Sequence, residues 1–198
     1  MGFMKYLKQT FRKELSKRDE NYRNRMIDFR QEPATVRVER PTRLDRAKTL
    51  GYKAKQGVFV VRQRVKRGSH VRERNIKGRR SRNQGMRKNL TKNYQQIAEE
   101  RVQKKYVNCE VLNSYFVLKD GQHYWYEVIM VDKDSPVVRK DKQFKFLLAP
   151  KNTKRVFRGT TSAGKKARGL DSKGKGAEKL RPSRKAAFNR KVNAQKKK

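Results

Sequence analysis

The stretch VNCEVLNSYFVLKDGQHYWYEVIMVD, residues 107–132, predicts the centre of the fold. Two runs rich in β-branched and aromatic residues flank Asp120 and Gly121. An Asp-Gly pair between such runs is a strong signal for a β-hairpin, because a tight hairpin turn needs residues that tolerate positive φ angles. The sequence therefore predicts two strands joined at residues 119–122.

The same part of the chain is neutral, whereas the rest is basic. The 198 residues carry 56 Lys and Arg against 18 Asp and Glu, a formal net charge of +38. Residues 106–149 hold six basic and six acidic groups and eight aromatic side chains. Folding requires buried apolar surface to offset chain entropy, so we expect the core here. Residues 150–198, with 18 basic and two acidic groups and few large hydrophobic residues, are predicted to form a basic extended tail that orders on a partner.

Helical periodicity marks three segments outside the hairpin. Two lie near the N-terminus, with apolar residues at Met4, Leu7, Phe11 and Leu15 and then at Tyr22, Met26 and Phe29; Pro33 ends this region. The third has one apolar face of Tyr94, Ile97, Ala98 and Val102. Glu99 and Glu100 are predicted to point elsewhere, as a solvated pair on its surface.

A short helix is predicted at roughly residues 43–50. Thr42 is the expected N-cap, Asp45 completes a capping box three residues later, and Gly51 supplies the stop. The next run, GVFVVRQRV at residues 57–65, is rich in β-branched residues and predicts a strand that sends Arg62 and Arg64 to one face.

The remaining segments complete an α+β expectation. Glu127, inside the second hairpin strand, is expected to face solvent or to be paired on an open face of the sheet. DSPVVRKD is expected to form a turn or a short helix, and FKFLL a last strand or a loop. We predict one domain over residues 1–149, with a small, mostly antiparallel or mixed sheet packed with helices. It contains a basic loop at about residues 66–92, and the basic tail follows over residues 150–198.

Several protein classes are disfavoured. No run of about 18 apolar residues could span a bilayer, and the N-terminus lacks the apolar region of a signal peptide. Cys109, the only cysteine, lies in an apolar run and is expected to be buried rather than nucleophilic. One cysteine and two scattered histidines do not match the spacing of a zinc site. No close pair of carboxylates suggests catalysis; Asp132 and Asp134 fit a turn. We therefore expect no enzyme and a soluble, intracellular chain.

GTTSAGKKARG, residues 159–169, resembles a phosphate-binding loop. Gly159, Gly164 and Lys165 fit G-x-x-x-x-G-K, but Lys166 stands where the motif requires the Ser or Thr that binds Mg²⁺. Such a loop also needs a buried strand before it and a helix after it, and the sequence predicts neither. We therefore expect Lys165, Lys166 and Arg168 to pair with the phosphates of a polymer, and the glycines to allow close approach to an RNA backbone.

The basic segments indicate a nucleic acid as the partner. So many positive charges would repel one another without a polyanion, and a pI near 10.9 is typical of nucleic-acid-binding domains. No helix-turn-helix, zinc finger or leucine zipper is present in the sequence. Extended basic arms suit compact ribosomal RNA. A phosphate-loop NTPase using Lys165 and a DNA-packaging protein remain as alternatives.

Several motifs resemble one known family. RPTRLDRAKTLGYKAKQG (residues 40–57), VFVVRQRVKRG (58–68), AEER (98–101), VLNSYFV (111–117), HYWYEVIMVD (123–132) and TSAGKKARGL (161–170) occur in this order. Together they resemble the large-subunit ribosomal protein family "fifteen-e" of archaea and eukaryotes, over roughly residues 1–190. Departures from the eukaryotic pattern around residues 69–90 and beyond residue 171 favour an archaeal member.

The resemblance implies a structural, non-catalytic component of the large ribosomal subunit in the cytoplasm. Its implied partners are large-subunit rRNA and neighbouring ribosomal proteins, with no membrane and no small-molecule substrate. It implies an α+β core with helices packed on a small, largely antiparallel sheet. No cofactor is implied, and any Mg²⁺ nearby would be bound to the rRNA.

RNA contact is expected at the basic residues of the loops and the tail. The resemblance assigns it to Arg40, Arg43, Arg46, Lys48, Tyr52, Lys53, Lys55, Arg62, Arg64, Lys66, Arg67, Lys165, Lys166 and Arg168. The density of positive charge adds Arg72, Arg74, Lys77, Arg79, Arg80, Arg82, Arg87, Lys88, Arg155, Arg158, Arg184 and Lys185.

Overall fold

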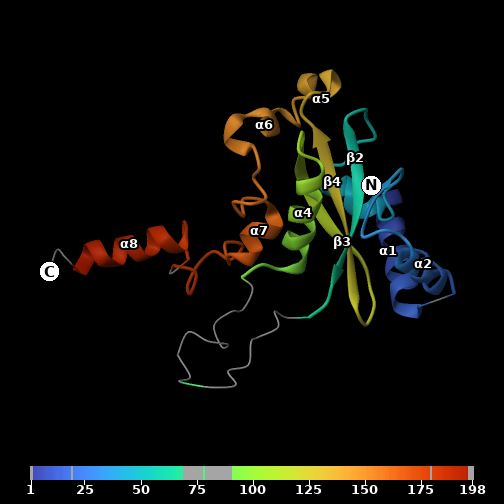
Figure 1. The fold of residues 1–198 in the computed structure, drawn as a ribbon, viewed down its shortest axis with the longest axis horizontal. Helices are drawn as coiled ribbons and strands as arrows, with labels where there is room; N and C mark the ends of the chain where they lie inside the picture. The colour runs from blue at the N-terminus through green and yellow to red at the C-terminus, as the bar shows by residue number, and fades with distance from the viewer. Residues whose placement is uncertain (1, 19, 69–77, 79–90, 179, 196–198) are drawn as a thin grey trace.

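A four-stranded antiparallel sheet forms the centre of the molecule. The computed structural model describes residues 2–18, 20–68, 78, 91–178 and 180–195. The strands are β1 (Thr35–Val38), β2 (Val58–Lys66), β3 (Cys109–Lys119) and β4 (His123–Asp132). They pair in the order β1-β2-β4-β3 (Figure 1). The predicted hairpin is confirmed as β3–β4, and the strand predicted at residues 57–65 is confirmed as β2.

The turn of the hairpin is held by the side chain of Asp120. Its Oδ1 accepts hydrogen bonds from the backbone N–H groups of Gln122, at 2.7 Å, and of His123. The Asp120 N–H donates in turn to the His123 carbonyl at 3.0 Å. The Asp side chain thus stabilises the turn locally, as expected for this residue type.

Alternating side chains of the sheet build two apolar layers. On one face Trp125, Ile129 and Val131 pack with Phe29 of helix α2. On the other face Val128 and Met130 pack with Val102 of helix α4. Both faces of β4 are therefore covered, which explains why its central residues, 125–131, are all buried.

Helices cover both faces of the sheet. The helices α1 (Gly2–Lys17), α2 (Glu20–Gln31) and α3 (Leu44–Thr49) lie on one side, and α4 (Tyr94–Lys105) lies on the other (Figure 1). The short helices α5 (Pro136–Lys140) and α6 (Lys145–Leu148) and the 3-10 helix η1 (Pro150–Asn152) follow β4. They lead to α7 (Ser162–Ala167) beside α4, and then to α8 (Arg184–Gln195), which projects away from the sheet (Figure 1). The α+β class and the predicted N-terminal helices are confirmed.

Local predictions were wrong at two places. FKFLL contributes to a helix rather than to the predicted strand or loop, because Phe144 and Leu147, three residues apart, both turn into the core. Thr42 does not cap α3: Arg43 is the cap residue and makes no side-chain cap bond, so there is no capping box. The Thr42 hydroxyl and N–H donate instead to Glu127. The edge strand β1 gave no clear pattern in four residues and was not predicted.

The packed body continues beyond residue 149, where the predicted domain ends. Val156 is fully buried with Val61 and Val128. Thr161 and Ala163 are also buried, against helix α4. Residues 150–170 therefore pack on the sheet and α4 instead of forming an extended tail.

Candidate nucleic-acid interface

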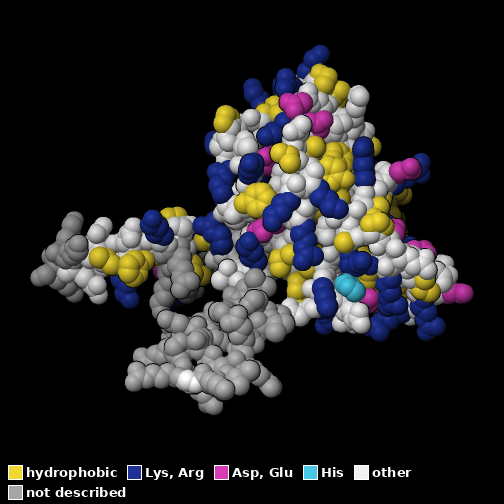
Figure 2. All heavy atoms as spheres, viewed as in Figure 1, with side chains coloured by type: hydrophobic (Ala, Val, Ile, Leu, Met, Phe, Trp, Pro, Cys, Tyr) yellow, Lys and Arg dark blue, Asp and Glu magenta, His cyan; other side chains and the backbone are white. Residues whose placement is uncertain are grey.

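Lys and Arg side chains are spread over the visible face, with only scattered acidic groups among them (Figure 2). Two basic segments carry most of the predicted contacts that the structure describes. We call residues 40–55, around α3, the α3 segment, and residues 150–170, around α7, the α7 segment. Both are loops and short helices laid on a rigid sheet, which is the usual placement of binding residues.

The α3 segment contains both exposed cations and cations that are paired within the protein. Arg40, Arg46 and Lys48 are exposed. Arg43, in contrast, is largely buried: its guanidinium pairs with Asp45 at 3.1 Å and lies 4.3 Å from the ring centre of Phe11. The exposed three are placed to meet a phosphate, whereas Arg43 holds the segment to α1.

The end of the α3 segment is fixed by one carboxylate. The ammonium groups of Lys53 and Lys55 lie 3.2 and 2.9 Å from Asp141. The hydrogen bond from Lys55, followed by weaker contributions including that from Lys53, holds the pKa of Asp141 well below its usual range. Tyr52 packs against the apolar layer under α2. These three predicted RNA contacts therefore also make contacts within the protein.

Strand β2 sends Arg62 and Arg64 to one face, as predicted, but that face is covered by α2. Arg62 is only 8% exposed, binds Glu32 at 2.6 Å and stacks 3.7 Å from the ring centre of Phe29. Arg64 donates to the Arg30 carbonyl at 2.8 Å. We do not carry Arg62 into the proposed interface, because its charge is already matched inside the protein. Lys66 and Arg67, at the end of the strand, are exposed.

The α7 segment is tied to the body by two polar anchors. The Thr161 hydroxyl accepts the N–H of Gly164 at 3.2 Å, which caps α7, and donates to Glu99 at 2.7 Å. Asn93 caps α4 and also donates its side-chain N–H to the Ala163 carbonyl at 3.1 Å. The N-termini of α4 and α7 are therefore locked together.

The glycines of this segment serve contact within the protein. A Cβ atom at Gly164 would lie 2.5 Å from the Cα of Gly159, which real atoms do not reach. Gly159 itself has a φ of +61°, in the region that favours glycine. The expectation that these glycines allow close approach to RNA was wrong for this pair, because they approach each other.

We expect Gly164→Ala to lower the free energy of unfolding by about 1–3 kcal/mol, because the added methyl group overpacks the turn. Urea unfolding followed by the fluorescence of Trp125, the only tryptophan, measures the change. Gly121→Ala is the matched control: a Cβ there meets nothing within 4 Å, so its effect should stay within about 0.5 kcal/mol. Equal effects of the two changes would contradict the proposed crowding.

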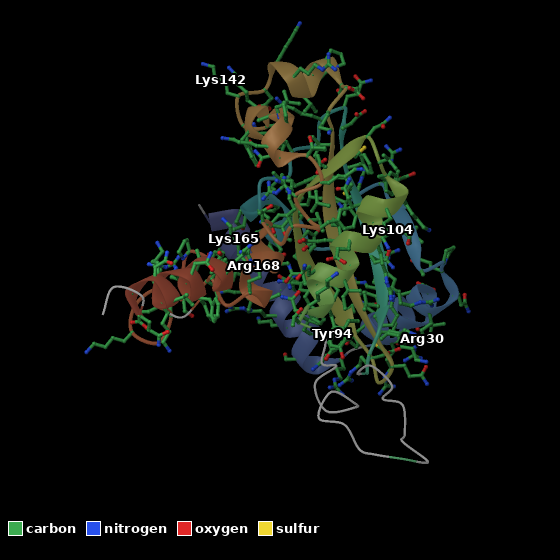
Figure 3. All side chains as sticks on the ribbon, turned by 60° about the vertical axis from the view of Figure 1, so that its left-hand side comes forward. Arg30, Tyr94, Lys104, Lys142, Lys165 and Arg168 are labelled. Carbon is green, nitrogen blue, oxygen red and sulfur yellow. The ribbon has the colours of Figure 1, made fainter. Side chains whose placement is uncertain are left out.

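Most cations of the α7 segment are exposed. Lys165, Lys166 and Arg168 are exposed, and Arg168 also donates to the Gly159 carbonyl at 3.2 Å. Figure 3 shows Lys165 and Arg168 close to each other. Arg158 is exposed and Arg155 is partly buried, with its guanidinium 5.5 Å from the ring centre of Phe146.

The surroundings do not form a nucleotide-binding loop. Residues 150–158 form a 3-10 helix and turns rather than a strand. Helix α7 spans only six residues and begins inside the motif, and its first turn is capped by Thr161. The exposed lysines of this segment can therefore contact an anion at the surface, but the segment does not form a loop that encloses a triphosphate.

Three buried carboxylates connect the basic segments to the sheet. Glu127 accepts from Thr42 in the α3 segment and, at 2.6 Å, from the Tyr115 hydroxyl. Glu99 accepts from Ser114 and from Thr161 of the α7 segment. Glu110 accepts the Lys154 N–H at 2.8 Å. Each acid thus connects a strand or helix of the core with a segment that presents positive charge.

Burial raises the pKa of Glu99 and of Glu127, although the hydrogen bonds from their hydroxyl partners oppose the shift. The prediction that Glu99 is solvated was wrong, because its carboxylate is buried between β3 and the α7 segment and accepts hydrogen bonds from Ser114 and Thr161. For Glu127, pairing was the correct alternative and solvent exposure the wrong one. Cys109 is buried as predicted, and burial raises its pKa to about 11.

The remaining predicted contacts lie elsewhere. Lys185 is exposed on α8, and Arg184 is the first residue of that helix. Eight residues of the predicted basic loop lie outside the described residues: Arg72, Arg74, Lys77, Arg79, Arg80, Arg82, Arg87 and Lys88.

Three basic residues that the sequence did not single out, Arg23, Arg30 and Lys119, line a groove between α2 and the hairpin. Their spacing carries no recognisable motif.

Fold and surface together define a basic protein of the nucleic-acid-binding class, with an α+β body and cations on segments tied to its core. No helix in the described part of the chain is both long and apolar enough to cross a bilayer. A family model described as Ribosomal L15 matches residues 2–187. The chain therefore belongs to this ribosomal protein family, as the sequence motifs predicted.

Two curated relatives from archaea are both called "Large ribosomal subunit protein eL15". The protein of Methanospirillum hungatei JF-1 is 52% identical over 167 residues, covering 84% of this chain and 85% of the relative. That of Methanocorpusculum labreanum is 54% identical over 160 residues, covering 80% and 81%. The similarity is consistent with the archaeal origin that the sequence favoured.

Proposed function

We propose that the chain is a structural constituent of the large ribosomal subunit that binds rRNA by neutralising its phosphates. Its exposed contacts are the cations of the α3 and α7 segments, including Arg40, Arg46, Lys165 and Lys166. The observation that carries the proposal is the separation of charge: buried carboxylates anchor these segments from inside, and the outer surface presents Lys and Arg. The names of the archaeal relatives support the same assignment.

Arginine and lysine suit this task in different ways. Arginine makes bidentate contacts with phosphate, while lysine acts as a compact point charge. Because the segments rest on a rigid sheet, these contacts form without ordering the whole chain first. The protein then acts by stabilising packed RNA, with other large-subunit proteins as further partners and with no chemical step and no cofactor of its own.

The two alternatives have less support. An NTPase using Lys165 would need an enclosed phosphate site, and the α7 segment is an open surface. A DNA-packaging protein would bind any duplex and would be found on chromosomes. Neither reading accounts for the family match over residues 2–187.

Sedimentation of cell extracts tests the proposal. A tagged copy expressed in an archaeal host should sediment with large ribosomal subunits at high Mg²⁺ and should be released when the RNA is digested. A matched extract treated with DNase should leave its position unchanged. Recovery on chromosomal DNA, or in the slowly sedimenting fraction with intact subunits present, would count against the assignment.

A further inference from the structure

A groove between α2 and the tip of the β3–β4 hairpin lies outside the α3 and α7 segments. We call it the α2–hairpin groove. Tyr22, Met26 and Ile27 provide its apolar floor, and Ile27 is 48% exposed. The Tyr22 hydroxyl donates to the Lys119 carbonyl at 3.3 Å and so fixes α2 against the hairpin.

The rim of the groove is strongly cationic. Five basic residues line it: Arg18, Arg23, Arg30, Arg67 and Lys119. Among the lining residues that the structure describes, Asp120 is the only acid. Its carboxylate is already engaged by the hairpin turn and by Arg30 at 3.1 Å, and its side chain is only 6% exposed. The groove therefore presents an excess of positive charge that the protein does not neutralise.

Two features favour a phosphate backbone as the occupant. Four of the five cations are arginines, whose planar guanidinium groups match phosphate oxygens. Arg67 also lies where β2 ends and the basic stretch of residues 66–92 begins, so the groove continues a segment already expected to contact RNA. Its guanidinium donates to the Asp120 carbonyl at 2.9 Å, which holds the start of that stretch at the rim.

The groove and the α7 segment lie on opposite faces of the sheet. Arg30 belongs to α2, which packs on the Trp125 face, whereas α7 packs beside α4 on the other face. Figure 3 shows Arg30 well apart from Lys165 and Arg168. A single RNA helix lying against the α7 segment would not reach the groove without passing around the edge of the sheet.

We propose that the α2–hairpin groove is a second RNA-binding site, which holds a phosphate backbone on the opposite face of the sheet from the α7 segment. One chain then joins two RNA segments across its own body. This inference rests on the proposed function, since it assumes that the chain binds RNA. It assigns binding to Arg18, Arg23, Arg30 and Lys119, which neither sequence motif nor charge run had singled out.

Ultraviolet crosslinking locates the RNA on each face. The full chain is combined with an RNA hairpin of mixed sequence and irradiated, and the crosslinked residues are identified by mass spectrometry. Tyr22 reports on the groove, and Phe157, which is 42% exposed, reports on the α7 segment. In the wild type both residues should crosslink. In the double variant Arg23→Gln, Lys119→Gln the Tyr22 yield should fall about tenfold or more at subsaturating RNA, while the Phe157 yield stays unchanged.

A matched double variant, Lys104→Gln with Lys105→Gln, removes the same charge from the exposed end of α4 and should leave both yields unchanged. Crosslinking at Phe157 but not at Tyr22 in the wild type would overturn the second site and leave the proposed function intact. No RNA crosslink at either residue, with no binding of the hairpin, would refute both. Weaker binding of a poly-glutamate peptide by the groove variant, with an unchanged Tyr22 yield, would assign the groove to an acidic protein segment and overturn the proposal.

Discussion

The affinity of this chain for large-subunit rRNA is expected to fall by about 10³–10⁵ when monovalent salt rises from about 50 to 200 mM. Each phosphate that a Lys or Arg neutralises releases condensed counterions, so every contact adds to the slope of log affinity against log salt concentration. The exposed cations of the α3 and α7 segments and of the α2–hairpin groove supply roughly ten such contacts. Filter binding over a salt series measures the slope.

Replacing two of these cations tests whether the slope arises from the predicted residues. Lys165→Gln with Lys166→Gln should reduce the slope by about 1–2 and weaken binding at low salt. The control pair Lys104→Gln with Lys105→Gln has the same net charge and should bind as the wild type does. If both pairs lowered the slope equally, affinity would depend on total charge alone and the α7 segment would have no special part.

Replacing Glu127 with alanine should lower the free energy of unfolding of the free protein by about 3–5 kcal/mol. The side chain is completely buried and accepts hydrogen bonds from Thr42 and Tyr115, with Arg62 3.9 Å away. Its removal leaves two hydroxyl groups, one N–H and part of a guanidinium without their partner. It also releases the start of the α3 segment from the sheet. Urea unfolding monitored by Trp125 fluorescence gives the value.

Glu39→Ala is the control, because Glu39 is an exposed acid three residues before Thr42 in the sequence. This change should alter the free energy of unfolding by no more than about 0.5 kcal/mol. If Glu127→Ala lowered the free energy of unfolding by no more than this, the hydrogen bonds of Glu127 would make no net contribution to stability. Proteolysis of the variant should also cut near residues 40–44 sooner than it does in the wild type, because the anchor of that segment is gone.

The pH dependence of stability gives an independent check on Glu127. Its pKa is raised in the folded state, so above the ordinary glutamate pKa of about 4.5 the unfolded chain loses a proton that the folded chain keeps. Stability therefore declines as pH rises from about 4.5 towards the raised value. Glu127→Gln cannot titrate, so its unfolding free energy should vary less with pH over this window, with the remaining slope due to Glu99.

The hairpin was predictable because its signals are local. Asp120 and Gly121 specify a turn through their own backbone preferences, and the flanking runs are long enough to identify as strands. Helix α6 was not predictable in the same way. FKFLL is too short to show a period, and its helical form depends on the core pocket that receives Phe144 and Leu147.

The function of the polar residues was harder to predict than the elements. Thr42 and Asp45 match a capping box by type, but Thr42 finds a stronger acceptor in Glu127, which is 85 residues away in sequence. Arg62 looks like its neighbours in the basic run, yet it is buried under α2. One signal was available: a glutamate in a strand that is apolar on both faces cannot stay unpaired, so YWYEVIMV already required a partner for Glu127.

The buried acids also change what an approaching RNA meets. Glu99, Glu110 and Glu127 count against the formal charge of +38, but they lie beneath the surface rather than on it. Where a raised pKa lets Glu99 or Glu127 keep its proton, that negative charge is lost altogether. Between the ordinary glutamate pKa of about 4.5 and these raised pKa values, the folded chain should therefore carry more positive charge than the unfolded chain. Folding places negative charge where it binds the protein's own segments and cannot repel the partner's phosphates.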